Sequence, residues 1–229
     1  TAPPIPEKAV LAEGQVVFTK EDVQAGQEVF LKYGLMDNGT IWGHGAYLGP
    51  DFSASYLHNL SVDAQQSLAE SSFQKPYDAL TLPEQQAVQL QVTDLLKENR
   101  YDPESGVLIL TAAEAASFQR QIQVWTDYFA STTSSSGLKQ NLISHPEEIK
   151  QLTAFFAWSA WASVAQRPDK PYSYTNNFPY DPSVANTATA DTVLWSALRL
   201  IALLGGLGLV LFVVGRWNFL GWRGKQEGE

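Results

Sequence analysis

The sequence predicts a mainly α-helical domain with one small β-hairpin, followed by a single membrane-spanning helix. Three observations lead to this fold class. Helix-start signals recur along the first 166 residues, one short strand-like segment follows a turn, and a long apolar run lies near the C-terminal end.

The helix-start signals are mostly capping patterns. Thr81 and Thr111 each stand three residues before a glutamate, as in a capping box, and predict helices to about Glu98 and Ala130. Other helices are expected at residues 19–32, 54–59, 62–72 and 145–166. The last of these holds four large aromatic residues and is the expected core helix: Phe155, Phe156, Trp158 and Trp161.

The remaining segments are expected to lack helix. Residues 102–106 form a turn before the β-branched and leucine-rich run 107–110, which predicts the hairpin. Residues 34–50 hold five glycines and residues 132–137 are rich in serine and threonine, so both are expected to be loops. Residues 1–18 and 167–191 are interpreted as extended segments.

The run Val193–Val214 has 22 residues and a single charge, Arg199. A helix of this length spans about 33 Å, close to the thickness of the hydrocarbon layer. Trp195 and Trp217 lie where interfacial aromatic residues are expected. A buried core helix is the alternative, but too little surrounding chain is available to cover it.

The charges on either side of this run predict its orientation. Arg216, Arg223 and Lys225 follow it, whereas no Lys or Arg lies between Lys170 and Arg199. The positive-inside rule therefore places the C-terminus in the cytoplasm and residues 1–191 outside, in the periplasm of a bacterium. An outside domain at this position also implies an earlier signal peptide or transmembrane helix upstream of Thr1.

Composition excludes several function classes. Residues 1–191 carry 11 basic and 22 acidic residues, a net charge of −11, which argues against nucleic-acid binding. The chain has no cysteine, so disulfides, thiolate catalysis, iron–sulfur clusters and a c-type heme attached through Cys-x-x-Cys-His are excluded. The three histidines lie far apart in the sequence and make a poor metal site: His44, His58 and His145.

Two further patterns have ordinary structural interpretations. The acidic pairs at 21–22 and 147–148 lie at expected helix starts, where carboxylates interact favourably with the helix dipole. The glycine-rich stretch 42–51 lacks the spacing of a nucleotide-binding loop and is interpreted as a tight loop, with Asp51 as the N-cap of the next helix.

Several stretches of the sequence, in order along nearly the whole chain, resemble the N-terminal region of single-chain, quinol-dependent nitric oxide reductases. The most specific are Trp42-Gly43-His44-Gly45-Ala46-Tyr47 and Tyr174-Thr175-Asn176-Asn177. Others are 2–6, 26–30, 49–54 and 153–158.

The resemblance implies a cytochrome c-like helical domain that has lost its heme, with Trp and Phe side chains in the vacated volume. The position expected for the heme-binding motif, near 35–41, has no cysteine. The resemblance also implies the reduction of two NO to N2O with two electrons from quinol. That reaction uses heme b, heme b3 and a non-heme iron on later membrane helices of the same enzyme, so this chain contributes no catalytic residue.

One metal site follows from the resemblance. In related cytochrome c-dependent enzymes, a Gly-Ala-Tyr segment contacts a calcium ion next to the heme propionates. Gly45 and Tyr47 match it and are expected to supply part of the calcium shell.

The resulting division has five parts: an extended arm (1–18), the cytochrome c-like domain (19–166), an extended segment at the membrane surface (167–191), the transmembrane helix (192–217) and a cytoplasmic connector (218–229). The expected function is a non-redox periplasmic cap on a quinol-dependent nitric oxide reductase in the bacterial inner membrane. The alternatives are a freestanding single-span binding or sensor protein and an electron-carrying small subunit, and the absent heme motif argues against the second of these.

Overall fold

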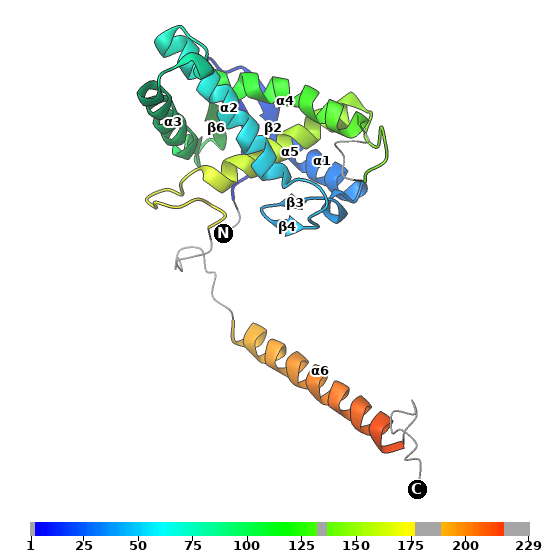
Figure 1. Cartoon of the computed structure of the whole chain (residues 1–229). Helices are drawn as coiled ribbons and strands as arrows, with labels where there is room; N and C mark the ends of the chain where they lie inside the picture. Colours follow the sequence, from blue (N-terminus) through cyan, green and yellow to red (C-terminus); the bar gives the residue numbers. More distant parts are fainter. Residues whose placement is uncertain (1–2, 132–136, 177–188, 218–229) are drawn as a thin grey trace. The chain divides into compact units, whose positions relative to one another are not determined.

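The computed structural model describes residues 3–131, 137–176 and 189–217. The chain divides into a folded domain, Ala2–Asn176, and a C-terminal unit that contains one long helix. Figure 1 shows the elements of both units. Residues 132–136 of the predicted loop, residues 177–188 of the expected extended segment 167–191 and the expected connector 218–229 lie outside the described residues.

The described part of the domain is mainly helical. Its α-helices are α1 (Lys20–Lys32), α2 (Phe52–Phe73), α3 (Leu82–Lys97), α4 (Ala112–Ala130) and α5 (Pro146–Val164). Short 3-10 helices follow α1 at Leu35–Asp37 and precede α3 at Tyr77–Ala79. Capping boxes open α3 and α4 at Thr81 and Thr111, as the sequence predicts, and a third opens α1 at Thr19.

Helices α1 and α5 cross in close contact. A Cβ atom on Gly26 would lie 2.0 Å from the carbonyl oxygen of Gln151 and 2.8 Å from Cβ of Phe155. Only glycine therefore permits this approach between the two backbones. The crossing brings Phe30 of α1 against Phe155 and Phe156 of α5 in the core.

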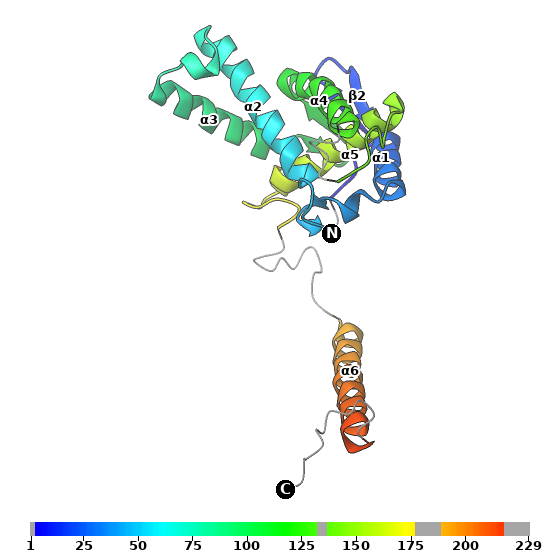
Figure 2. The same ribbon diagram turned by 45° about the vertical axis from the view of Figure 1, so that its right-hand side comes forward.

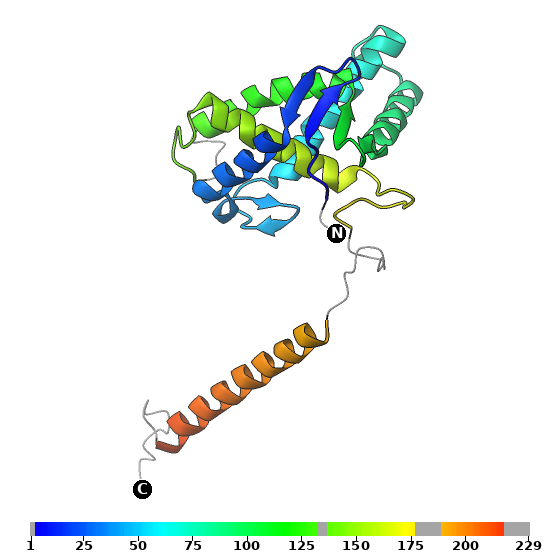
Figure 3. The same cartoon turned by 180° about the vertical axis from the view of Figure 1, so that it is seen from behind.

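A small sheet covers one side of the domain (Figure 3). Its strand order is β2 (Val16–Thr19), β1 (Lys8–Leu11), β6 (Val107–Leu110) and β5 (Tyr101–Asp102). The predicted hairpin is the antiparallel pair β5–β6. Strand β1 pairs in parallel with β6, so the sheet joins segments almost 100 residues apart.

Three expectations of local structure were wrong. The arm 1–18 is not simply extended, because β1 and most of β2 lie within it and pair with each other. The single small hairpin is part of a four-stranded sheet, and a second sheet is formed by β3 (Thr40–Ile41) and β4 (His44–Gly45). The helices expected at 54–59 and 62–72 are one continuous helix, α2.

Helix α3 packs beside α2, as Figure 2 shows. The connection is fixed by Tyr77, whose backbone N–H donates to Gln66 Oε1 at 3.1 Å and whose hydroxyl accepts from Gln89 Nε2 at 2.7 Å. The two helices also enclose an apolar strip that includes Leu60 of α2 and Val92 of α3, both buried.

The C-terminal unit contains α6 (Ala190–Trp217), a 28-residue helix with a mean hydropathy of 2.5 over its most apolar window. None of that window is buried against the rest of the chain. By length and composition α6 is long and apolar enough to cross a membrane. A core helix of a soluble protein would be mostly buried, so this observation disfavours the alternative considered from the sequence.

Candidate functional site

The centre of the domain is an aromatic cluster contributed by α1, α2, α4 and α5. Phe52 and Phe156 stack with ring centroids 4.9 Å apart and planes at 10°. Trp125 packs edge-on against Phe156 at 4.9 Å, and Phe30 packs edge-on against Phe52 at 5.7 Å. All four side chains are at most 2% exposed, so they form a dry, closely packed core.

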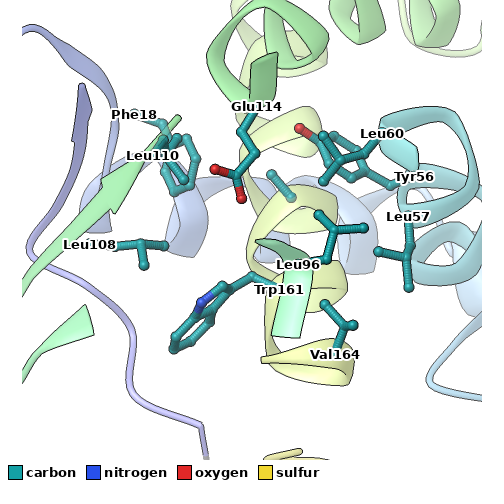
Figure 4. A pocket seen from close by; sticks show the side chains of 11 residues that line it. Phe18, Tyr56, Leu57, Leu60, Leu96, Leu108, Leu110, Glu114, Trp161 and Val164 are labelled. Carbon is teal, nitrogen blue, oxygen red and sulfur yellow. The ribbon is translucent and has the colours of Figure 1, made fainter. Parts of the chain in front are cut away.

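A cavity beside this cluster is too small for a cofactor. It measures about 30 Å³, roughly the volume of one water molecule, and its walls are mostly leucine and aromatic side chains (Figure 4). The carboxylate of Glu114 also lines it, but this group is fully engaged elsewhere. Both of its oxygens accept from Arg100 Nη2 at 2.7 Å, and Oε2 also accepts from the backbone and hydroxyl of Thr111.

Arg100 is a hub for the elements around the cavity. Besides Glu114, it donates to the carbonyl oxygens of Leu95 in α3 and Ile109 in β6. Its side chain is 16% exposed and that of Glu114 is 9% exposed, so this is a largely buried ion pair in which one guanidinium nitrogen contacts both carboxylate oxygens. It fixes the end of α3, the strand β6 and the start of α4 to one another, and it has a structural role.

The predicted calcium residues lie at the end of the β3–β4 hairpin and just after it. Gly45 pairs with Thr40, and its φ of 138° together with a Cβ position 2.3 Å from the carbonyl oxygen of Gly39 requires glycine. Tyr47 follows the hairpin, 84% exposed, and its hydroxyl donates to the carbonyl of Gly43 at 3.1 Å. Gly45 and Tyr47 therefore lie together at the surface of the domain.

Asp51 organises this hairpin. Its Oδ2 accepts from the Thr40 hydroxyl at 2.7 Å and the Gly43 backbone at 2.6 Å, and its Oδ1 accepts from the hydroxyl of Ser53 and the backbone of Ala54. It caps α2, as predicted. Burial raises the pKa of Asp51, but these four hydrogen bonds outweigh it and hold the pKa below the ordinary value of 3.8. Both oxygens are occupied, so Asp51 offers no ready metal ligand.

Trp42 anchors the hairpin to α5. Its indole N–H donates to the carbonyl oxygen of Ser159 at 2.8 Å, and its ring packs against Trp158 at 5.6 Å. Trp42 itself has a φ of 52°, in the left-handed region that is unusual for a large side chain. The turn is therefore held against α5 by Trp42. Tyr47 and Leu48, which follow it, are exposed to solvent.

The other sequence candidates are not brought together. No group of three His, Asp or Glu side chains suited to a metal ion occurs within the described residues. Both acidic pairs lie at helix starts, at 21–22 and 147–148. In the first pair, Asp22 completes the capping box of α1. Glu148 accepts from Lys32 at 2.6 Å and from Tyr33 at 2.9 Å, and the bond from Lys32 is the main cause of its lowered pKa.

A family model described as the NorB cytochrome c-like domain of nitric oxide reductase matches residues 6–180. The chain belongs to this family. A search of curated proteins finds no match. Family membership makes the domain part of a nitric oxide reductase and agrees with its mainly helical fold.

The residues of this NorB domain do not fit a covalently attached heme. The chain has no cysteine to form the thioether bonds. The stretch expected to hold the motif forms the 3-10 helix Leu35–Asp37 and strand β3, with Leu35 fully buried in the core. The aromatic and aliphatic side chains described above therefore pack against one another rather than around a covalently attached heme.

Proposed function

We propose that this chain is the N-terminal portion of a quinol-dependent nitric oxide reductase and that its domain is a non-redox cap over the heme-bearing membrane part. The observation that carries the proposal is a cytochrome c-like domain of the NorB family without any heme attachment site. Such a domain has no thioether-attached heme through which to relay electrons. A donor that reaches the membrane part directly, such as quinol, removes the need for one.

The proposed reaction converts two NO, two electrons and two protons into N2O and water. Heme b, heme b3 and the non-heme iron supply the redox chemistry in the membrane part of the enzyme. The residues described above shape and stabilise the cap, and none of them is proposed to touch the reacting atoms. The partners of the cap are the remaining transmembrane helices and the membrane.

The proposed topology places residues 1–191 on the periplasmic side, α6 across the inner membrane and residues 218–229 in the cytoplasm. The excess of basic residues after α6 and the acidic character of the domain support this orientation. Residues 19–166 form the cytochrome c-like domain in this scheme, and 167–191 lead to the membrane surface. Protease added to intact spheroplasts is expected to cleave the domain, and full protection would contradict the orientation.

We also propose that Gly45 and Tyr47 contribute to a calcium site completed by the membrane part. The exposure of Tyr47 and its position beside Gly45 support a shell shared with another surface. A calcium ion requires six to eight oxygen ligands, and this hairpin supplies only a few. Chelation that leaves the heme spectrum of the complete enzyme unchanged would argue against the site.

A freestanding sensor remains the competing function, and membership of the NorB family favours the reductase. The test is to isolate the native polypeptide from bacterial membranes with an antibody to the domain. We expect a mass well above the 25.2 kDa of this chain, together with NO reduction driven by a quinol. A native mass near 25.2 kDa and no NO consumption would favour the sensor.

A further inference from the structure

Helix α6 carries its only charge within the apolar run at Arg199. The tryptophans Trp195 and Trp217 lie 22 residues apart, or about 33 Å along the helix. Arg199 lies about 6 Å inside the first of them, at the edge of the hydrocarbon layer of the membrane proposed above. No ion pair of Arg199 occurs within the described residues, and a charge at this depth of a membrane needs a polar partner.

The residues around Arg199 form a polar stripe. Thr192, Trp195 and Ser196 precede Arg199 by seven, four and three residues, so all four lie on one face of the first turns of α6. The neighbouring positions on the other faces are apolar, including Val193, Leu194, Ala197 and Leu198. Hydrogen-bond donors are therefore concentrated on a single face of this helix end.

The direction of the side chains brings these donors together. Side chains of a helix lean toward its N-terminus, so the long Arg199 side chain extends back past Trp195 and Ser196 toward the interface. The Ser196 hydroxyl makes no hydrogen bond within the described residues. In contrast, Thr153 and Ser159 of α5 donate to the carbonyl four residues earlier, at 2.7 Å each. The Ser196 hydroxyl can therefore donate to a ligand bound on the stripe.

We propose that this stripe binds the phosphate of an anionic phospholipid in the outer leaflet. A guanidinium group matches phosphate oxygens with two parallel N–H donors, and the Trp195 indole N–H and the Ser196 hydroxyl add two neutral donors. The Thr192 hydroxyl lies on the same face but is hydrogen-bonded to the Thr189 hydroxyl at 2.8 Å. The nearest acid on the helix, Asp191, is eight residues before Arg199 and faces the water layer. A carboxylate on another membrane helix is the competing partner, but the stripe opens toward the interface, where lipid phosphates lie.

Arg216 provides a matched control on the same helix. It lies near the opposite end of α6, and the residues three, four and seven positions before it are Val213, Phe212 and Leu209. It has the same guanidinium group beside an interfacial tryptophan but no hydroxyl neighbours on its face. A generic attraction of basic residues to anionic lipid predicts equal effects at both ends, whereas a built site predicts an effect at Arg199.

The experiment measures retention of phosphatidylglycerol by the full chain, released from nanodiscs of phosphatidylglycerol and phosphatidylcholine, using native mass spectrometry. We expect R199Q to lower phosphatidylglycerol retention about tenfold, as the loss of a charge-assisted hydrogen bond predicts. S196A should lower it by a smaller factor, and R216Q should change it little. Equal losses for R199Q and R216Q, or no loss for R199Q, would overturn the proposal.

The inference rests on the proposed membrane topology, and the two can fail separately. Resistance of the chain to alkaline extraction from membranes tests whether α6 is inserted, independently of any bound lipid. An inserted chain whose lipid retention does not depend on Arg199 refutes the phosphate site and leaves the topology intact. That result would favour a carboxylate on another membrane helix of the complete enzyme as the partner of Arg199. A chain that is fully extracted at alkaline pH refutes both.

Discussion

Replacing Gly26 with alanine tests the close crossing of α1 and α5. The new Cβ would lie 2.0 Å from the Gln151 carbonyl oxygen, about 1.4 Å short of the 3.4 Å at which ordinary contact begins. The obstacle is backbone, so the helices have to separate and loosen the packing of Phe30 on Phe155 and Phe156. Overpacking of this kind costs about 1–3 kcal/mol or more, whereas the better helix propensity of alanine returns only about 1 kcal/mol.

We therefore expect Gly26→Ala to lower the free energy of unfolding by roughly 2 kcal/mol. The measurement is urea denaturation of the full chain in mild detergent, followed by tryptophan fluorescence, because the buried Trp125 reports on the adjoining aromatic cluster. Gln27→Ala, on the exposed side of the same turn, is the control and should change stability by less than about 0.5 kcal/mol. Equal stability of the two variants would show that the helices do not approach as closely as described.

Three further changes test other parts of the account. Phe156→Ala should destabilise the domain by about 3–5 kcal/mol, measured by the same denaturation, and a loss below about 1 kcal/mol would contradict a close-packed aromatic core. Arg100→Met leaves the Glu114 carboxylate buried without its cation and should lower the free energy of unfolding by about 3–5 kcal/mol. Glu98 is the exposed partner of Arg100, so Glu98→Ala should change stability little. Similar losses for the two variants would refute the hub role of Arg100. Because the folded-state pKa of Asp51 lies below 3.8, its stabilisation is complete above that pH and is lost as the pH falls through the folded value. Acid titration of stability should therefore be shallower for Asp51→Asn than for the parent chain, and parallel curves would remove Asp51 as a contributor.

The helices were largely predictable from the sequence because their signals are local. The capping boxes at Thr81 and Thr111 placed α3 and α4 to within about a residue at either end. Helix α2 was divided in two because its polar residues interrupt the apolar pattern near residue 61. In the folded chain the Ser61 hydroxyl donates to the Leu57 carbonyl and stays within a continuous helix.

The hairpin β5–β6 was predicted, but strands β1 and β2 were missed because the pairing of β1 with β6 is not local. Strand β1 is only four residues long, and it is stabilised by β6, almost 100 residues later in the chain. A short segment with prolines before it has no periodicity that distinguishes a strand from an extended arm. Parallel pairing of this kind follows from tertiary contacts, which a local pattern does not record.

The candidate site was predictable in part. Asp51 as an N-cap is confirmed, but its second role as the acceptor for Thr40 and Gly43 across the loop depends on contacts eleven and eight residues away. The attachment of Trp42 to Ser159 and the hub at Arg100 likewise join segments distant in sequence. The calcium role of Gly45 and Tyr47 remains a prediction.

The most direct test of the central claim is the electron donor of the enzyme that carries this domain. We would measure NO consumption by the purified native enzyme with a reduced quinol and with reduced cytochrome c, and stain the same polypeptide for covalent heme. The account predicts activity with quinol, none with cytochrome c, and no covalent heme. Activity with cytochrome c alone, or covalent heme on this polypeptide, would contradict it.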